Sequence, residues 1–433
     1  MSVADHDSLA TAGEALDGSC FRYQSDALYA EGVPLALIAE QCGTPCYVYS
    51  RAAIEDAYRE FSGALDGVPH RVCYAVKANS NIAVLQVLAR LGSGFDVVSG
   101  GELERVLKAG GDASRVIFSG VGKTPVEMAR ALQVGVGCIN IESPAELDVL
   151  ETVAAQTGKV APVGIRVNPD VDARTHPYIS TGLKENKFGV PIDQAITLAA
   201  RVRSSRHLDL QGIGCHIGSQ ITDLAPLSEA FASMLALAER IEQDGPPLQH
   251  LDLGGGLGVR YRDESPIPID HYARSIKRLL ANRRDLLLNF EPGRRIVARA
   301  GVLLTRVQYL KQQGTKHFAI VDAAMNDLIR PALYQAWHSV QPVDRGALGK
   351  RCEWDLVGPV CESGDFLARA RTLSLSAGHL LAIGEAGAYS FVMSSNYNAR
   401  GRAPEVLVDG SKFTVVRRRE TIEDALALEQ LLP

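Results

Sequence analysis

A repeated alternation between residues 72 and 294 constrains the fold of this chain more than any other feature of the sequence. Eight short runs of β-branched or apolar residues each end in a polar or glycine-rich tip, and amphipathic helical segments lie between them. The runs are VCYAVKAN from 72, GFDVVS from 94, VIFSG from 116, CINIE from 138, VGIRVNP from 163, LQGIGCHIGS from 210, HLDLGGG from 250 and LLNFEPGR from 287. Eight strands that alternate with helices predict a (β/α)8 TIM-type barrel, because a doubly wound sheet normally uses fewer strands.

The pattern changes after residue 301, where β-rich runs follow one another without regular helical segments. These runs are GVLLTRVQYL, HFAIVDA, CEWDLVGPVC, HLLAIGE and PEVLVDG. We therefore predict a barrel over residues 49–300 and a C-terminal, mainly antiparallel β domain, a barrel or sandwich, over residues 301–433. Residues 21–48 are expected to contribute a strand to that β domain, and residues 1–20 to form a flexible tail.

The composition excludes several classes of protein. With 46% hydrophobic residues, 22% charged residues and a net charge of -5, the chain is typical of a globular protein and has no overall attraction to nucleic acid or anionic lipid. No apolar run approaches the roughly 18 residues of a membrane span, and the acidic N-terminus lacks a leader pattern, so we expect a cytoplasmic protein. The eight cysteines are too dilute for a disulfide scaffold, and the neighbours Cys42 and Cys46 lack a second pair for zinc, so no metal site is predicted.

The polar tips of the eight runs are informative when they are considered together. In a barrel, the carboxyl ends of all strands meet on one face, which is where the active sites of this fold lie. The tips are Lys77, Asp96, Ser119, Asn140 with Glu142, Arg166 with Asn168, His216 with Ser219, Gly254–Gly256, and Glu291 with Arg294. Because a core would not gather such groups, we predict an active site on this face.

The glycine-rich tip after the seventh run is a candidate phosphate site. Backbone N–H groups of Gly254, Gly255 and Gly256 can approach an anion closely, and barrels often bind phosphate at the loops after strands 7 and 8. The eighth run ends in Glu-Pro-Gly-Arg, in which Arg294 adds a positive charge. The alternative is that these glycines only form a tight turn.

Lys77 ends an otherwise apolar run and would be buried in the mouth of the barrel. Burial lowers the pKa of an unpaired lysine and makes it an amine nucleophile, whereas an isolated lysine at a strand end more often reaches solvent. A Schiff-base lysine, a phosphate cradle and a carboxylate for a pyridinium nitrogen are the parts of a pyridoxal phosphate site. Glu291 is the candidate carboxylate, and its alternative role is an ion pair with Arg294 or Arg295.

His216 and Ser219 extend this hypothesis. His216 could pack flat on the cofactor ring, with Ser219 reaching the phosphate, although a lone histidine at a strand end is more often a structural hydrogen-bonding group. A metal-dependent hydrolase on the same barrel is a weak alternative, because the first strand carries no His-x-His pair and the ten histidines do not cluster at strand ends.

Long ordered motifs make the sequence resemble the alanine racemase-like, pyridoxal phosphate-dependent decarboxylases of fold type III. The resemblance covers residues 22–430 and is strongest to the branch that acts on diaminopimelate, in its proteobacterial form. The motifs are YAVKAN at 74–79, GFDVVSGGEL at 94–103, SGVGKT at 119–124, RVNPDVDARTHPYISTGLKENKFG at 166–189, CHIGSQ at 215–220, LDLGGGLG at 251–258, EPGR at 291–294, RPALY at 330–334, CESGDF at 361–366 and GAYSFVMSSNYN at 387–398.

The resemblance implies a role for each matching residue. Lys77 would bind pyridoxal phosphate covalently, and Cys361 would be the proton donor. The other cofactor-binding residues would be Asp96, His216, Ser219, Gly254, Gly255, Gly256, Glu291, Pro292, Gly293, Arg294 and Tyr389. The substrate's distal end would contact Arg294, Arg330, Tyr334, Glu362 and Tyr389, since arginine suits a carboxylate and glutamate an ammonium group.

The resemblance also implies a homodimer in which Cys361 and Glu362 complete the active site of the neighbouring subunit. The implied reaction is decarboxylation of meso-2,6-diaminopimelate at its D-centre to L-lysine and carbon dioxide, the last step of lysine biosynthesis. Two alternatives stay open. One is a decarboxylase of the same fold that acts on another substrate, such as a D-amino acid, ornithine, arginine or a carrier-bound group. The other is a non-catalytic regulatory homologue.

Overall fold

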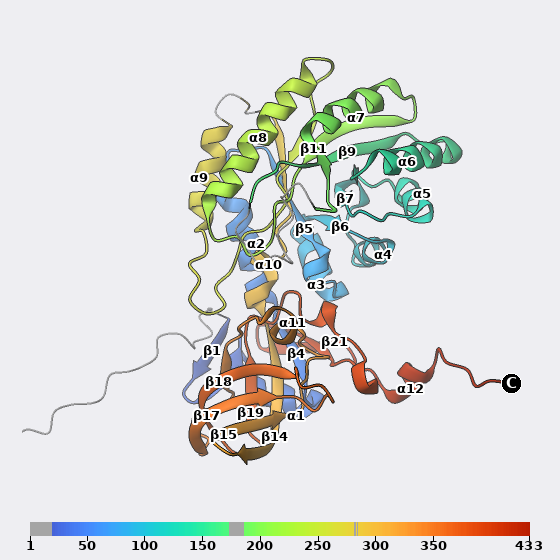
Figure 1. Cartoon of the computed structure of the whole chain (residues 1–433). Coiled ribbons are helices and arrows are strands. Elements are labelled where there is room, and N and C mark those ends of the chain that lie inside the picture. The colour runs from blue at the N-terminus through green and yellow to red at the C-terminus, as the bar shows by residue number, and fades with distance from the viewer. Residues whose placement is uncertain (1–19, 173–185, 281–282, 284) are drawn as a thin grey trace, which may run out of the picture.

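The eight predicted strands form a closed parallel barrel in the computed structural model, which describes residues 20–172, 186–280, 283 and 285–433. The predicted tail of residues 1–20 therefore lies outside the described residues, apart from Cys20. The barrel strands are β5 (His70–Ala75), β6 (Gly94–Val97), β7 (Val116–Phe118), β8 (Cys138–Ile141), β9 (Ala161–Asn168), β11 (Leu208–Gly214), β12 (His250–Asp252) and β13 (Leu287–Phe290). Figure 1 shows this barrel as one half of the molecule.

Strand order follows chain order around the barrel. Each strand pairs in parallel with the next, and β13 closes the ring on β5 through the pair Leu288 and His70. The short β10 (Val190–Pro191) extends the sheet beside the end of β9. The predicted barrel class is confirmed, and the carboxyl ends of all eight strands meet at one face.

Helices cover the outside of the barrel, as Figure 1 shows. They are α2 (Arg51–Ala64), α3 (Ile82–Arg90), α4 (Gly100–Lys108), α5 (Pro125–Val134), α6 (Pro144–Thr157), α7 (Ile192–Ser204), α8 (Leu224–Glu242) and α9 (Ile269–Leu279), followed by the short α10 (Arg294–Val297) and the 3-10 turn η4 (Ala298–Ala300). Local sequence fixes their ends. In α5, Thr124 and Glu127 form a capping box at the start and Gly135 ends the helix in the left-handed conformation.

A second, mainly antiparallel sheet forms the other half. Its strands are β4 (Cys46–Ser50), β14 (Gly301–Gln313), β15 (Lys316–Val321), β16 (Val340–Pro342), β17 (Lys350–Val357), β18 (Phe366–Leu375), β19 (Leu380–Ile383), β20 (Glu405–Asp409) and β21 (Lys412–Arg417). Seven of them run in the order β18-β17-β15-β14-β4-β20-β21, and β19 joins β14 to β16. Two pairs, β15 with β17 and β20 with β4, are parallel.

The N-terminal segment contributes the interior strand β4 to this sheet, between β14 and β20. Side chains alternate along a strand, so Tyr47 and Tyr49 enter the main core while Cys46 and Val48 face a second, smaller core. That smaller core also contains residues of a separate three-stranded sheet, β1 (Phe21–Gln24), β2 (Ala27–Ala30) and β3 (Val33–Pro34), and of α1 (Leu35–Cys42). The predicted boundary between residues 48 and 49 falls inside β4. The division of the chain into domains at residues 20, 48 and 300 stays a prediction.

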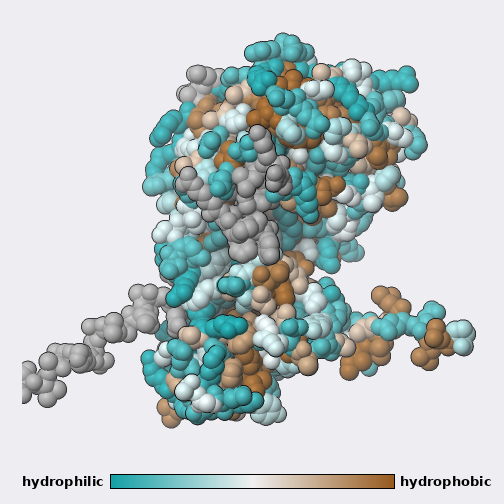
Figure 2. All heavy atoms as spheres, in the orientation of Figure 1, coloured by the Kyte–Doolittle hydropathy of each residue, from teal (hydrophilic) through white to brown (hydrophobic). Residues whose placement is uncertain are grey.

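The C-terminal arm of the chain carries the most exposed apolar side chains. Figure 2 shows apolar residues gathered along this arm, which consists of α12 (Ile422–Leu426) and the residues after it. They are Ile422, Leu426, Leu428, Leu431 and Leu432. Among the described residues, no helix has both the length and the apolar character that crossing a bilayer requires.

Candidate active site

A cavity of about 790 Å³ opens at the carboxyl ends of the barrel strands. Nine of the predicted tip residues line it, namely Lys77, Asp96, Ser119, Asn140, Arg166, His216, Ser219, Glu291 and Arg294. The second half of the chain closes its other side with Arg330 and Tyr334 of α11 (Arg330–Tyr334) and with Tyr389. Glu142 does not line the cavity. Its carboxylate pairs at 3.1 Å with Arg166, which does line it, so Glu142 supports the site indirectly.

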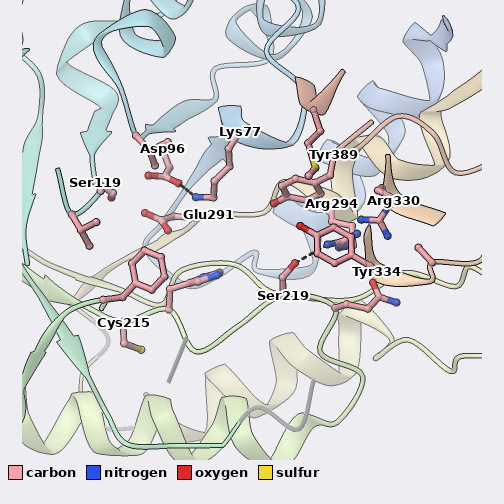
Figure 3. Close-up of a pocket in the computed structure, with 18 of the residues that line it drawn as sticks. Lys77, Asp96, Ser119, Cys215, Ser219, Glu291, Arg294, Arg330, Tyr334 and Tyr389 are labelled. Atoms are coloured by element: carbon pink, nitrogen blue, oxygen red, sulfur yellow. Dashed lines mark hydrogen bonds and ion pairs between the residues drawn. The ribbon is translucent and has the colours of Figure 1, made fainter. Parts of the chain in front are cut away.

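Lys77 lies at the acidic end of the cavity. It follows β5 in the 3-10 turn η1 (Val76–Ala78), and its Nζ is 2.5 Å from Oδ2 of Asp96 on β6. Figure 3 shows Glu291 on the same side of the cavity as this ion pair. About 34% of the Lys77 side chain is exposed, while Asp96 is fully buried. The amine therefore faces the cavity with a carboxylate already in contact.

The pKa of Lys77 shifts in the opposite direction from the one expected for an unpaired buried lysine. Burial alone lowers this pKa, but the negative charges of Asp96 and Glu291 outweigh burial and raise the pKa above its usual value. The sequence could not show that two carboxylates from other strands surround the amine. Lys77 is therefore protonated near neutral pH and must lose a proton before it can act as a nucleophile.

Asp252 adds a third buried carboxyl group to this end. It ends β12, lines the cavity, and accepts a hydrogen bond from the Gly254 N–H at 2.8 Å. Burial raises the pKa of both Asp252 and Glu291. The negative charge of Asp96 adds to the effect on each group, and that of Asp252 adds to the effect on Glu291. The alternative role of Glu291 as a partner of arginine finds no support, because Arg295 pairs with Glu60 and Arg294 donates to Tyr261 and Ser219.

A small hollow beside the glycine loop adjoins the main cavity. Gly254, Gly255, Gly256, Pro292, Gly293 and Arg294 line it, together with Lys77, His216, Ser219 and Tyr389. Gly254 and Gly256 have φ angles of 62° and 102°, and a Cβ on Gly255 would lie 2.1 Å from the Glu291 carbonyl oxygen. The turn itself therefore needs glycine, and the same glycines let backbone come close to whatever enters the hollow.

His216 makes a structural hydrogen bond as well as lining the cavity. Its Nδ1 accepts from the Gly255 N–H at 3.2 Å, which links the tips of two strands. Burial, together with the positive charges of Arg166 and Lys77, lowers the pKa of His216 well below its usual value. The ring is thus neutral, and both of the roles considered for it from sequence are compatible with this geometry.

The opposite end of the cavity carries two buried arginines. Arg294 donates to the Tyr261 hydroxyl at 2.6 Å and to Ser219 Oγ at 3.0 Å, while Arg330 donates to His338 Nε2 at 3.4 Å. In the part of the chain that the structure describes, neither guanidinium pairs with a carboxylate. Burial, reinforced by the charge of Arg294, lowers the pKa of Arg330. Aromatic faces of Tyr261, Tyr334 and Tyr389 lie 4.7–5.9 Å from these guanidiniums. Figure 3 shows Tyr334 and Tyr389 beside the two arginines.

Cys361 and Glu362 do not line this cavity. Both are exposed; the Cys361 N–H donates to Asn398 Oδ1 at 2.7 Å, and Glu362 Oε2 accepts from the Tyr397 hydroxyl at 3.2 Å. Of the predicted site residues, these are the two that the fold does not bring to the cavity of their own chain.

Sequence reasoning missed three side chains that shape the site. Tyr261 and His338 lie outside every predicted tip, in irregular segments whose patterns carry no signal of their own. Asp252 could have been found, since a carboxylate within the apolar run HLDLGGG has no place in a buried strand unless the site uses it.

Known proteins share both the sequence and the architecture of this chain. A family model described as pyridoxal-dependent decarboxylase, pyridoxal binding domain, matches residues 51–298. The diaminopimelate decarboxylase of Pseudomonas aeruginosa is 62% identical over 95% of this chain and 99% of its own length, and that of Vibrio cholerae is 56% identical over 95% and 99%.

The chain belongs to the diaminopimelate decarboxylases. Solved structures of this family have the same fold. The enzyme from Helicobacter pylori, complexed with L-lysine, has a TM-score of 0.88 at 42% identity and covers 91% of this chain and 98% of its own. The diaminopimelate decarboxylase of M. jannaschii has a TM-score of 0.91 at 34% identity, over 96% and 98% of the two chains.

Diaminopimelate decarboxylases with this domain use pyridoxal phosphate, and the cavity fits that group. The Lys77 amine borders both the main cavity and the glycine-lined hollow, so one molecule could contact it and both spaces. Glu291 borders the same two spaces, where it could face a pyridine nitrogen. Arg294 supplies a positive charge beside the hollow, where its buried Nε has no partner among the described residues. Amine, carboxylate and anion site are the three features that this cofactor requires.

Proposed function

We propose that this chain removes carbon dioxide from the D-centre of meso-2,6-diaminopimelate and releases L-lysine, the last step of lysine biosynthesis. One observation carries the proposal: the cavity has a lysine among carboxyl groups at one end and, at the other, two arginines that pair with no carboxylate of the described residues. This arrangement suits a substrate that reacts at one amino acid centre and is held by the carboxylate of a second.

The arginine end selects the substrate in this proposal. Arg294 and Arg330 offer planar guanidiniums to the carboxylate of the L-centre, with Tyr334 and Tyr389 beside them. Both arginines are about 5% exposed, so solvent screens their charge weakly. Ornithine and arginine have no carboxylate at the far end of the side chain and would leave two buried charges without a partner.

The acidic end prepares the reacting groups. Asp96 Oδ2 is the nearest acceptor for the proton that Lys77 Nζ must lose before it bonds to an aldehyde carbon. Bound pyridoxal phosphate supplies an electron sink for the pair left behind when a carboxylate departs as carbon dioxide. Glu291 keeps a proton on the nitrogen of that sink, and Gly254–Gly256, Pro292, Gly293, His216 and Ser219 orient the ring and the phosphate.

We further propose a homodimer in which Cys361 of the partner subunit returns a proton to the decarboxylated carbon. Both Cys361 and Glu362 are exposed and neither lines the cavity of its own chain, which supports this assignment. Glu362 of the partner subunit then holds the ammonium group of the L-centre. The C–C bond to the carboxylate breaks, and the electron pair that it leaves behind forms the new C–H bond with the thiol proton. We place the enzyme in the cytoplasm.

A substrate panel tests the proposed reaction. Purified protein loaded with pyridoxal phosphate is given meso-diaminopimelate, its LL isomer, lysine, ornithine and arginine, and carbon dioxide is measured. We expect rapid release from the meso isomer alone. Faster release from ornithine or arginine would assign the cavity to another substrate, and no release from any compound, with the cofactor bound, would favour the regulatory homologue.

Subunit mixing tests the shared site. Lys77→Ala and Cys361→Ala proteins are each expected to be inactive, and a mixture should regain activity because hybrid dimers contain one intact site. Subunit exchange is verified separately with differently tagged copies. Exchange without recovered activity would refute the assignment of Cys361 to the neighbouring cavity.

A further inference from the structure

His338 lies directly behind Arg330, on the side away from the cavity. It is fully buried, and its Nδ1 is 2.8 Å from the carbonyl oxygen of Gly384. A carbonyl oxygen only accepts hydrogen bonds, so Nδ1 carries the proton and Nε2 is left with a lone pair. That lone pair faces Arg330 Nε, which donates to it at 3.4 Å.

The imidazole is held in this orientation from several sides. The His338 carbonyl oxygen accepts from Arg371 Nη2 at 2.9 Å, and the Tyr261 ring meets the imidazole edge-on with centroids 5.4 Å apart. The same Tyr261 accepts from Arg294 and lies 5.0 Å under the Arg330 guanidinium. Tyr261 and His338 thus connect the two arginines into one unit.

The charge of His338 matters as much as its position. Burial and the nearby positive charges of Arg330, Arg294 and Arg371 lower the pKa of His338 to about 3, so the ring is neutral under all ordinary conditions. A carboxylate at this position would also accept from Arg330, but it would cancel the positive charge. A neutral acceptor fixes the guanidinium and leaves the charge for a ligand.

We propose that His338 is a positioning residue that aims Arg330 at the distal carboxylate of the substrate and, by being neutral, preserves the attraction between them. This inference rests on the proposed function, because it assumes that Arg330 binds that carboxylate. His338 itself does not border the cavity.

Two variants with side chains of equal length distinguish the effect of fixing Arg330 from the effect of the charge at position 338. His338→Gln supplies a neutral acceptor, whereas His338→Glu supplies a carboxyl group, whose charged form three nearby arginines favour. His338→Leu, which has no acceptor, is the third variant and replaces the glutamate variant if that protein fails to fold. Each holoenzyme is compared with wild type for inhibition by L-lysine and by cadaverine, which is lysine without its carboxylate.

The proposal predicts a difference between the two inhibitors. In His338→Glu and His338→Leu, the inhibition constant of L-lysine should rise about tenfold, while that of cadaverine changes less than about twofold. His338→Gln should keep both constants near the wild-type values. Equal changes for the two inhibitors would show a merely structural role, and no change in the Glu and Leu variants would overturn the proposal. Wild-type protein that releases no carbon dioxide from meso-diaminopimelate would instead refute the proposed function.

Discussion

The Lys77 end and the arginine end of the cavity differ in the partners that surround their positive charges. At the Lys77 end, one cation contacts the carboxylate of Asp96, and the carboxyl groups of Glu291 and Asp252 line the same end, so the protein supplies an acidic partner for the amine. At the other end, Arg294 and Arg330 are more deeply buried than Lys77, but their partners are hydroxyl groups, an imidazole and aromatic faces. Neutral partners satisfy hydrogen-bond donors without neutralising the charge.

This difference separates chemistry from recognition. Charge-paired groups can exchange protons over short distances, which the reacting end requires. A buried guanidinium that has only neutral partners destabilises the protein, because its charge is removed from water. Binding of a ligand carboxylate offsets this loss of free energy. The cavity is thus complete at one end and complementary to an anion at the other.

The largest expected effect is that of removing the lysine. Lys77→Ala should lower turnover more than about a thousandfold, because Lys77 is the only lysine among the described residues that line the cavity, and should abolish the visible absorbance of bound cofactor. The surface variant Lys159→Ala serves as the control. A Lys77→Ala protein that retained both absorbance and turnover would place the reacting amine elsewhere.

Sequence periodicity predicted the framework of this site well. Eight apolar runs with polar tips are sufficient to place Lys77, Asp96 and Glu291 on one face, because parallel strands bring their carboxyl ends together. In the second half, β18 was missed because Arg369 and Arg371 interrupt its apolar alternation, and β16 is too short to show a period.

The electrostatics of the site could not be predicted in the same way. The pKa of Lys77 depends on the distances to carboxylates on two other strands, which no local pattern encodes. Tyr261 and His338 reach the arginines from irregular segments, where neither a 2-residue nor a 3.6-residue period applies. Tertiary packing alone brings them there.

The second prediction concerns the arginine end. Arg330→Met keeps most of the side-chain volume and removes the charge, so the KM for meso-diaminopimelate should rise about a hundredfold. Cofactor absorbance should be unchanged, because Arg330 does not line the glycine hollow. Steady-state kinetics and absorbance spectra check both statements, with the exposed Arg299→Met as control. Loss of cofactor in the Arg330 variant would contradict the separation of the two ends.

The third prediction uses pH to probe the acidic end in cofactor-free protein. Burial raises the pKa of Asp252 well above its usual value near 4, so the folded state keeps a proton that the unfolded state loses. The contribution to stability is therefore present below about pH 4 and is lost as the pH rises toward about pH 7. Between pH 4 and pH 7, the free energy of unfolding should therefore fall by about 1–3 kcal/mol less in Asp252→Asn than in wild type.

Urea unfolding of wild type and Asp252→Asn at several values between pH 4 and pH 8 measures this difference. The matched control is Asp285→Asn, which changes an exposed carboxylate outside the cavity. If wild type and Asp252→Asn showed parallel pH dependence, the raised pKa of Asp252 would be refuted.

The smallest effect is expected at Ser219, which lies where the two ends meet. Its Oγ accepts from Arg294 at 3.0 Å, and the residue borders both the main cavity and the glycine hollow. If Ser219 serves the phosphate, Ser219→Ala should weaken cofactor binding about fivefold, the loss of one hydrogen bond, and leave KM nearly unchanged. Titration of the cofactor-free protein and steady-state kinetics measure the two quantities, and Ser219→Thr should restore the wild-type affinity. A higher KM with unchanged cofactor affinity would instead assign Ser219 to the arginine end, because its remaining contact is then with the guanidinium that holds the substrate.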